Sequence, residues 1–244
     1  MSNLLQERDA TEFKSHASNL VEIWLALMIR KQYQEAESIC IEFIEEYGSL
    51  FGNRILEIEE DEYNNLLILL ILVKALQEYV QLCKTTKNPS WHEDKPTVES
   101  VWIKLCDCRE RLEFVSHYFQ GEVIERVIQD LNGLEEFFRD VFGNGYYCSP
   151  GIVLDGSICN ICSQDFRACS HIAGRLYAGR ICFYQPLNPQ IDHVAIVKTP
   201  KDLRCRIWDW HIKDNEDKKT GITIENLCVL TTFSVNDFLR AFES

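Results

Sequence analysis

Apolar side chains recur at the spacing of an α-helix along the first 142 residues of the chain. The first clear stretch has apolar residues at Leu20, Ile23, Trp24, Leu27 and Met28. After a short connection at 30–32 the pattern resumes and runs to Tyr47, and Gly48 predicts the end of this second helix. Two helices joined by so short a connection are expected to pack antiparallel.

Three more helices are predicted before residue 143. The third covers about 61–83 and is rich in leucine, the fourth covers about 98–118, and the fifth follows Gly121. The segment 87–97 holds two prolines among mixed charges, so it predicts a loop. The first 143 residues therefore predict an all-helical bundle of about five helices.

The pattern changes at FGNGYY (142–147), because its glycines disfavour a helix and β-favouring residues follow. Short strands are predicted at 180–187, 192–199, 204–212 and 222–233. The polar segment 213–221 predicts a hairpin connection, and Ser234 predicts the cap of a short final helix. We expect an α+β chain with an acidic α-helical bundle at 1–143 and a zinc-binding α+β domain at 144–244.

Composition indicates a folded globular protein, since 46% of the residues are hydrophobic and 26% are charged. The longest apolar run, 66–73, is far shorter than the roughly 20 residues needed to cross a bilayer. It predicts a buried helix segment. The first residues are polar and acidic, without a signal-peptide pattern. We expect a soluble, cytoplasmic protein that does not bind membranes.

The negative charge of the chain is concentrated in its first part. Residues 1–150 hold 27 acidic and 14 basic side chains, a net charge of −13, whereas residues 151–244 hold 11 of each. An acidic surface repels nucleic acid and anionic membranes and suits a basic protein partner. The alternative interpretation is a well-solvated helical surface with no partner.

Four residues form the strongest chemical signal: Cys159, Cys162, Cys169 and His171. A Cys-x2-Cys turn aims both sulfurs at one point, and a Cys-x-His pair follows after six residues. Three thiolates and one imidazole form the closed tetrahedral shell of structural zinc. Unrelated thiols and a redox-active Cys-x2-Cys pair are the alternatives. Of the chain's eleven cysteines, an odd number, we expect the others to be reduced.

The fourth ligand has two competing candidates. Cys182 could replace His171, and His193 could approach from the next strand. His171 is preferred because the sequence already ties it to Cys169. Either choice saturates the site, whereas a catalytic zinc keeps one position for water. The pattern therefore argues against a hydrolase.

Two stretches resemble known families. Residues 30–48 resemble one tetratricopeptide-type helical hairpin, without a second copy at a 34-residue period. The run CNICSQDFRACSHIAGRLYAGRIC (159–182), continuing into HVAIVKTP (193–200), resembles a cysteine-rich segment of some tailed-phage head-assembly and prophage-encoded proteins. That resemblance implies a small zinc-stabilised β module. No protease or capsid region accompanies it here.

Basic residues gather near the cysteines and suggest a candidate phosphate or nucleic-acid contact, formed by Arg167, Arg175, Arg180, Arg204 and Arg206. Asp209 and His211 share one face of a predicted strand and are the weak candidate for an acid–base pair. No nucleophile elbow, phosphate-binding glycine loop or zinc-protease helix motif occurs.

The function expected from these features is a non-enzymatic zinc-binding interaction protein, an adaptor or complex subunit whose acidic helical domain binds a protein partner. The alternatives are a nucleic-acid-associated factor that uses the basic residues and an accessory subunit of an enzyme. Homo-oligomerisation is open, because no heptad pattern imposes it.

Overall fold

The computed structural model describes residues 2–52, 59–208 and 210, with side chains described for all of these except 2–9 and 49–52. The predicted hairpin connection at 213–221, the strand at 222–233 and the helix from Ser234 lie outside the described residues, as do Asp209 and His211.

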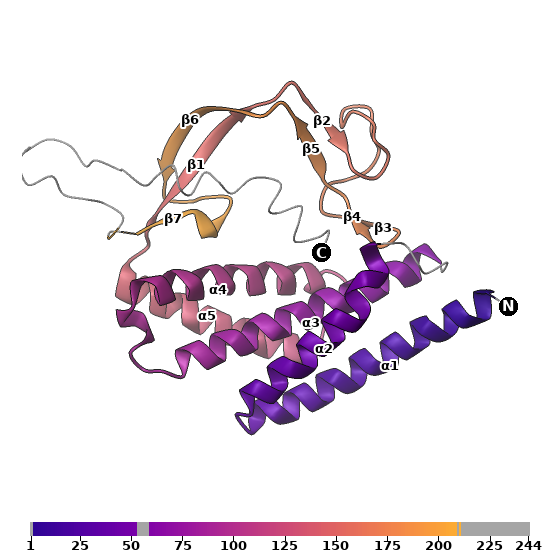
Figure 1. Cartoon of the computed structure of the whole chain (residues 1–244). Coiled ribbons are helices and arrows are strands. Elements are labelled where there is room, and N and C mark those ends of the chain that lie inside the picture. The colour runs from indigo at the N-terminus through magenta and orange to yellow at the C-terminus, as the bar shows by residue number, and fades with distance from the viewer. Residues whose placement is uncertain (1, 53–58, 209, 211–244) are drawn as a thin grey trace, which may run out of the picture. The chain divides into compact units, whose positions relative to one another are not determined.

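Five α-helices precede a small set of antiparallel strands, so the predicted α+β fold class is confirmed (Figure 1). The helices are α1 (Ser2–Ile29), α2 (Tyr33–Gly52), α3 (Glu60–Thr86), α4 (Lys95–Ser116) and α5 (Glu122–Phe142), with a short 3₁₀ turn at Trp91–Glu93.

Two predicted helix boundaries were wrong. α2 does not end at Gly48 but continues to Gly52, since a single glycine costs a helix only about 1 kcal/mol. The predicted loop at 87–97 already contains the start of α4. Asp94 caps that helix by accepting a hydrogen bond from the Thr97 N–H, and Pro96 lies in the first turn, where no N–H is needed.

α1 begins eighteen residues before Leu20, where the first apolar stretch was recognised. Ala10, Phe13 and Ala17 continue the buried face that leads to Leu20 and Trp24. The spacing of three and four residues is that of one helix face. The earlier start was therefore readable from the sequence.

α3 forms the centre of the helical core, and Figure 1 shows it among its neighbouring helices. Its fully buried side chains include Leu66, Ala75, Leu76 and Val80. By length and composition α3 alone, among the described helices, could cross a membrane, but 56% of its apolar window is buried inside the protein. Such burial is typical of the core helix of a globular protein, as predicted for 66–73.

Polar contacts also join the helices. Glu37 of α2 accepts hydrogen bonds from Lys84 and Gln81 of α3. Burial opposes the charge of Glu37, but these hydrogen bonds and the nearby lysines outweigh it and lower the pKa of the carboxyl group. Glu37 is therefore a buried, paired carboxylate rather than part of the exposed acidic surface.

The described residues after the helices form seven strands: β1 (Tyr146–Val153), β2 (Gly156–Cys159), β3 (Leu176–Tyr177), β4 (Arg180–Ile181), β5 (Tyr184–Leu187), β6 (Gln190–Val197) and β7 (Arg206–Ile207). β1 pairs with β6 and, over two residues only, with β7. β2 pairs with β5, and β3 with β4. All these pairs are antiparallel.

The predicted strands are matched only in part. The segment 180–187 is interrupted between β4 and β5, and β6 begins two residues before the predicted 192. Within 204–212 only β7 is a described strand, preceded by a 3₁₀ turn at Leu203–Cys205. Strands β1, β2 and β3 were missed.

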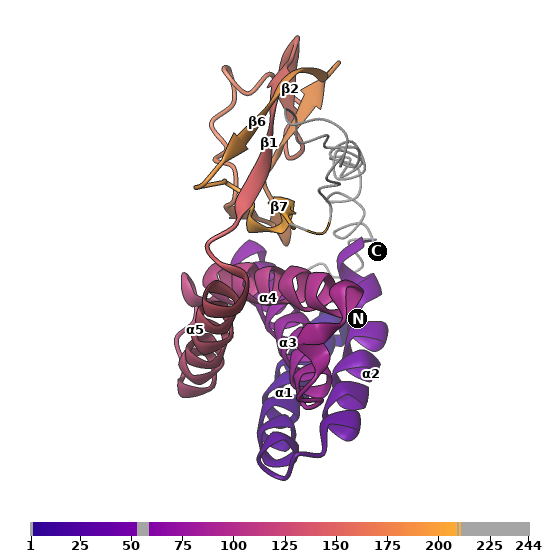
Figure 2. The same ribbon diagram turned by 90° about the vertical axis from the view of Figure 1, so that its left-hand side faces the viewer.

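Along most of its length the β1–β6 pair is a two-stranded ribbon (Figure 2). Its register shifts at Asp192, so that Ile191 lies opposite Ile152 and shares a face with Val194 and Ile196. These four residues, here called the apolar strip, are 44–57% exposed. The ribbon therefore has an apolar face that the described part of the chain does not cover.

The chain divides into two compact units. The first contains residues 1–135, 160–162 and 170–183, and the second contains 136–159, 163–169 and 184–244. The single domain boundary expected between 143 and 144 stays a prediction.

Candidate metal centre

The four predicted ligand residues converge. The candidate ligand atoms of Cys159, Cys162, Cys169 and His171 all lie within 4.8 Å of one another. Cys159, at the end of β2, is completely buried, and the other three residues are partly buried. Four ligands from 13 consecutive residues thus form a compact group.

Hydrogen bonds fold the Cys-x2-Cys turn. The N–H of Ser163 donates to the carbonyl of Cys159 at 2.8 Å, and the N–H of Cys159 donates to the carbonyl of Gln164 at 2.9 Å. Ser163 has φ of +60°, a left-handed conformation that costs a non-glycine residue on the order of 1 kcal/mol. The backbone reverses directly after Cys162, and this brings its sulfur back toward Cys159.

Asn160 anchors the turn to the chain that follows the cluster. Its side-chain Nδ2 donates to the Ile181 carbonyl at 3.0 Å, and its Oδ1 accepts from the Phe183 N–H at 2.8 Å. Its own N–H donates to the Phe183 carbonyl at 3.1 Å. The sequence analysis missed this role. An asparagine side chain can both donate and accept a hydrogen bond, so its place beside a predicted ligand cysteine was a usable signal.

Asp165 and Arg167 order the loop between the two ligand pairs. The Asp165 carboxylate accepts from both the guanidinium and the backbone N–H of Arg167. The guanidinium hydrogen bond is the main reason that the pKa of Asp165 is lowered to about 2. The loop is therefore shaped by its own polar groups.

Tyr177 lies against the histidine of the cluster. The two rings meet edge to face with their centroids 4.6 Å apart, and the Tyr177 hydroxyl accepts a hydrogen bond from the Ile172 N–H at 3.0 Å. These contacts position the segment that carries His171. Sequence analysis had assigned Tyr177 no such role.

The β3–β4 turn is held against α3 within the first unit. The N–H groups of Ala178 and Gly179 donate to the side chains of Glu60 and Asn64 at 3.0 and 2.8 Å. Gly179 has φ of +70°, and a Cβ atom there would overlap the ring of Tyr63. This position requires glycine for both reasons.

The competing fourth ligands do not belong to the group. Cys182 is buried, and its backbone bonds to Gly174 and Arg175. His193 is exposed on β6, where its Nδ1 lies 3.0 Å from the Asp192 carboxylate. The geometry therefore favours His171 among the three candidates.

The ligand set fits a metal that prefers soft ligands in a tetrahedral site. Zinc–sulfur bonds of about 2.3 Å place two sulfurs about 3.8 Å apart in a tetrahedron. The separations of up to 4.8 Å need only a small contraction to reach that geometry. The cluster can hold a metal ion with four protein ligands.

Most of the arginines proposed for phosphate contact are engaged elsewhere. Arg167 pairs with Asp165, and Arg204 pairs with Asp202 at 2.8 Å. Arg180 donates to the carbonyls of the Cys-x2-Cys turn at 3.4 and 3.5 Å.

Arg206 is 3% exposed and donates to the carbonyls of Phe142 and Gly143. Its guanidinium also lies 4.6 Å from the Trp208 ring centroid. Of the five arginines only Arg175 is exposed without such a bond. The phosphate or nucleic-acid contact expected from these arginines stays a prediction.

No disulfide joins the ten cysteines that the structure describes. Burial raises the pKa of Cys40 to about 12, and the Cys108 thiol, whose pKa is also raised by burial, donates to the Ala75 carbonyl. These thiols stay protonated near neutral pH, as small apolar core residues do.

Comparison with known protein families, with curated proteins and with solved structures found no match. The resemblances to the phage cysteine-rich segment and to a tetratricopeptide hairpin therefore remain sequence-based proposals. What is established is a helical protein with a small antiparallel β region that carries a Cys₃His cluster suited to a metal ion.

Proposed function

We propose that this protein is a non-enzymatic, zinc-binding interaction protein: an adaptor or complex subunit whose acidic helices bind a basic protein partner. The convergence of Cys159, Cys162, Cys169 and His171 is the single observation that carries the zinc assignment. Three thiolates and an imidazole match structural zinc better than magnesium or calcium, which prefer oxygen ligands.

A structural role for the metal follows from the number of ligands. Four protein ligands complete a tetrahedral shell and leave no position for the water that a catalytic zinc activates. The short strands around the cluster have little apolar burial of their own. Metal binding supplies the free energy that such a small segment otherwise lacks. Reduced thiols at a zinc site also favour the cytoplasm.

The acidic surface of α2 supports the interaction role. This helix contains no basic residue, and Glu35, Glu42, Glu45 and Glu46 are all exposed. Glu42 lies three and four residues before Glu45 and Glu46, so these carboxylates are neighbours on the helix surface. The excess of negative charge over the helical part favours fast, salt-sensitive binding of a basic protein surface.

Native co-purification tests this function. Tagged full-length protein is purified at low and high salt, and stably bound proteins are identified and quantified by mass spectrometry. We expect a basic partner whose recovery falls when Glu35, Glu42, Glu45 and Glu46 are all changed to glutamine.

The matched control removes four exposed acidic groups elsewhere, with Glu93, Glu113, Glu125 and Asp140 changed to their amides. Because both variants lose the same charge, only the α2 variant should lose the partner. Equal loss of the partner from both variants would mean that overall charge, and not the α2 surface, determines binding. Unchanged recovery of the partner with both variants would contradict the proposal. Recovery of nucleic acid in place of protein would favour the alternative of a nucleic-acid-associated factor.

A further inference from the structure

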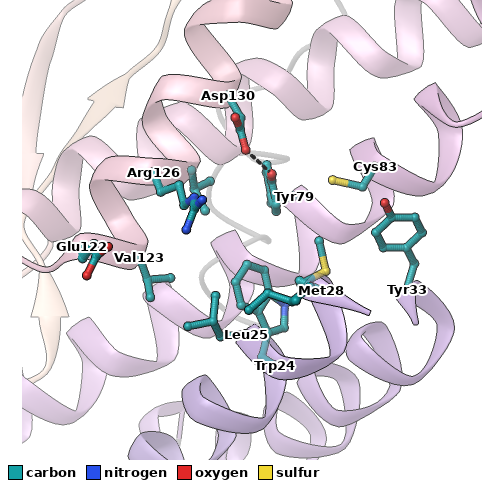
Figure 3. Close-up of a pocket in the computed structure, with 12 residues that line it drawn as sticks. Trp24, Leu25, Met28, Tyr33, Tyr79, Cys83, Glu122, Val123, Arg126 and Asp130 are labelled. Atoms are coloured by element: carbon teal, nitrogen blue, oxygen red, sulfur yellow. Dashed lines mark hydrogen bonds between the residues drawn. The ribbon is translucent and has the colours of Figure 1, made fainter. Parts of the chain in front are cut away.

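A cavity of about 320 Å³ lies among α1, α3 and the first half of α5, entirely within the first compact unit. Its volume is at the lower end of the range of small-molecule sites. Figure 3 shows side chains from these helices and from the start of α2 around it. The cavity is separate from the metal cluster and from the acidic face of α2.

One wall of the cavity is apolar and aromatic. It is lined by Trp24, Leu25, Met28, Tyr33 and Val123, among others. Trp24 is almost completely buried, and its ring centroid lies 6.0 Å from that of Tyr79. Such a wall favours an occupant with a compact apolar or aromatic group.

The opposite side carries three charged residues of α5, Glu122, Arg126 and Asp130, at intervals of one helical turn (Figure 3). Asp130 accepts a hydrogen bond from the Tyr79 hydroxyl. The side chains of Glu122 and Arg126 form no ion pair or hydrogen bond with any described residue, and both residues are exposed and line the cavity. One negative and one positive side chain of the cavity lining are thus available to a ligand.

The polar groups deeper in the cavity do not suggest covalent chemistry. Burial is the main cause that raises the pKa of Cys83 to about 11, so this thiol is protonated near neutral pH. Burial likewise raises the pKa of Tyr79, whose hydroxyl proton is donated to Asp130. The indole N–H of Trp24 has no hydrogen-bond partner among the described residues. The cavity is built to bind rather than to react.

We propose that this cavity binds a free α-amino acid with a large apolar side chain. The ammonium group lies at Glu122, the carboxylate lies at Arg126, and the side chain enters the apolar wall around Trp24. A purely anionic ligand would meet the carboxylates on both sides of Arg126, and a purely cationic ligand would meet the arginine. A zwitterion satisfies both free charges, and each charge-assisted contact strengthens binding.

The test compares three ligands of nearly the same shape on the full-length protein: L-phenylalanine, phenethylamine without the carboxylate, and 3-phenylpropionate without the ammonium. Binding is measured by calorimetry and by the NMR shift of the Trp24 indole N–H, assigned with Trp24→Phe. We expect L-phenylalanine to bind at one site about tenfold more tightly than either analogue.

Two variants assign the charges. Arg126→Gln should weaken L-phenylalanine and 3-phenylpropionate about tenfold, and it should not weaken phenethylamine, whose repulsion by the arginine is removed. Glu122→Gln should weaken L-phenylalanine and phenethylamine, and it should not weaken 3-phenylpropionate, whose repulsion by the Glu122 carboxylate is removed. The controls Arg139→Gln and Glu125→Gln alter exposed charges of α5 that do not line the cavity, so they should change none of the three affinities.

Absence of saturable binding by L-phenylalanine, L-leucine and L-tryptophan would overturn the proposal. So would equal affinity for the three ligands with no response to either variant, because that result would describe a site that recognises apolar shape alone. Neither result bears on the metal cluster or on the acidic surface of α2.

Discussion

The helices α1–α4 and the β1–β6 ribbon use apolar residues in opposite ways. The helices bury most of theirs, and Leu66, Ala75 and Leu76 of α3 are each 0% exposed. The ribbon leaves the apolar strip about half exposed. A two-stranded sheet has no second layer to cover its faces and is only marginally stable by itself. Burial of apolar side chains therefore stabilises the helices. The β region lacks such burial, and in our account the metal bound by its cysteine-rich segment stabilises that segment instead.

This contrast teaches where each kind of stability can arise. A helix of 27 residues such as α3 can contact neighbours on several sides. Strands of two to four residues such as β2, β3 and β4 cannot bury enough surface to offset the loss of chain entropy. In our account the free energy of metal binding stabilises these short strands in place of a hydrophobic core, as it does in small metal-binding domains.

Removal of the metal should have the largest effect. We expect a strong chelator to unfold the segment 156–187 and leave α1–α4 folded, because metal binding supplies on the order of 10 kcal/mol to a segment with little core. Hydrogen exchange followed by mass spectrometry measures both regions in one sample. Loss of protection confined to 156–187 supports the account, whereas simultaneous loss in α3 would mean that the two regions are not energetically separate.

The same substitution at a buried and an exposed isoleucine should separate the helices from the ribbon. Ile71 of α3 is 5% exposed and Ile196 of β6 is 52% exposed. Ile71→Ala should lower the free energy of unfolding by about 2–5 kcal/mol, and Ile196→Ala by less than about 1 kcal/mol. Urea denaturation of both variants gives the comparison. A large loss in Ile196→Ala would indicate that the apolar strip is covered in solution.

A smaller, pH-dependent effect should come from Glu37. Its pKa is lowered in the folded state, so its ionised form contributes stability above the unfolded pKa of about 4.5, and this contribution is lost as the pH falls through the lower folded value. At pH 7 we expect Glu37→Gln to cost about 1–2 kcal/mol. The difference from the unmodified protein should shrink below pH 4.5. A cost that does not change with pH would show that packing, and not charge, is responsible.

How much could be predicted from the sequence depended on the distance between interacting residues. The metal cluster was predicted because its four ligands lie within 13 residues and their spacing is characteristic by itself. The five helices were predicted because their apolar periodicity is long. Boundaries were less certain, since Gly48 and Pro96 are compatible with both a helix and its end.

The contacts that position the cluster were beyond sequence analysis. Asn160 bonds to residues more than twenty positions away, and the ring of Tyr177, a residue of the β3–β4 hairpin, contacts that of His171 in the folded chain. β1 was missed because Pro150 and Gly151 disfavour a strand, although they are tolerated here because this part of β1 pairs with β6 on one side only. Burial of Arg206 likewise depends on carbonyls at Phe142 and Gly143, far away in the sequence.

The metal content of purified full-length protein, prepared without a chelator, tests the central claim most directly. The account predicts one zinc ion per chain, loss of that zinc in Cys162→Ser, and its retention in Cys205→Ser, which alters a similarly half-buried cysteine outside the cluster. Protein without stoichiometric metal, or a Cys162→Ser variant that keeps its zinc and its protection in 156–187, would contradict the account.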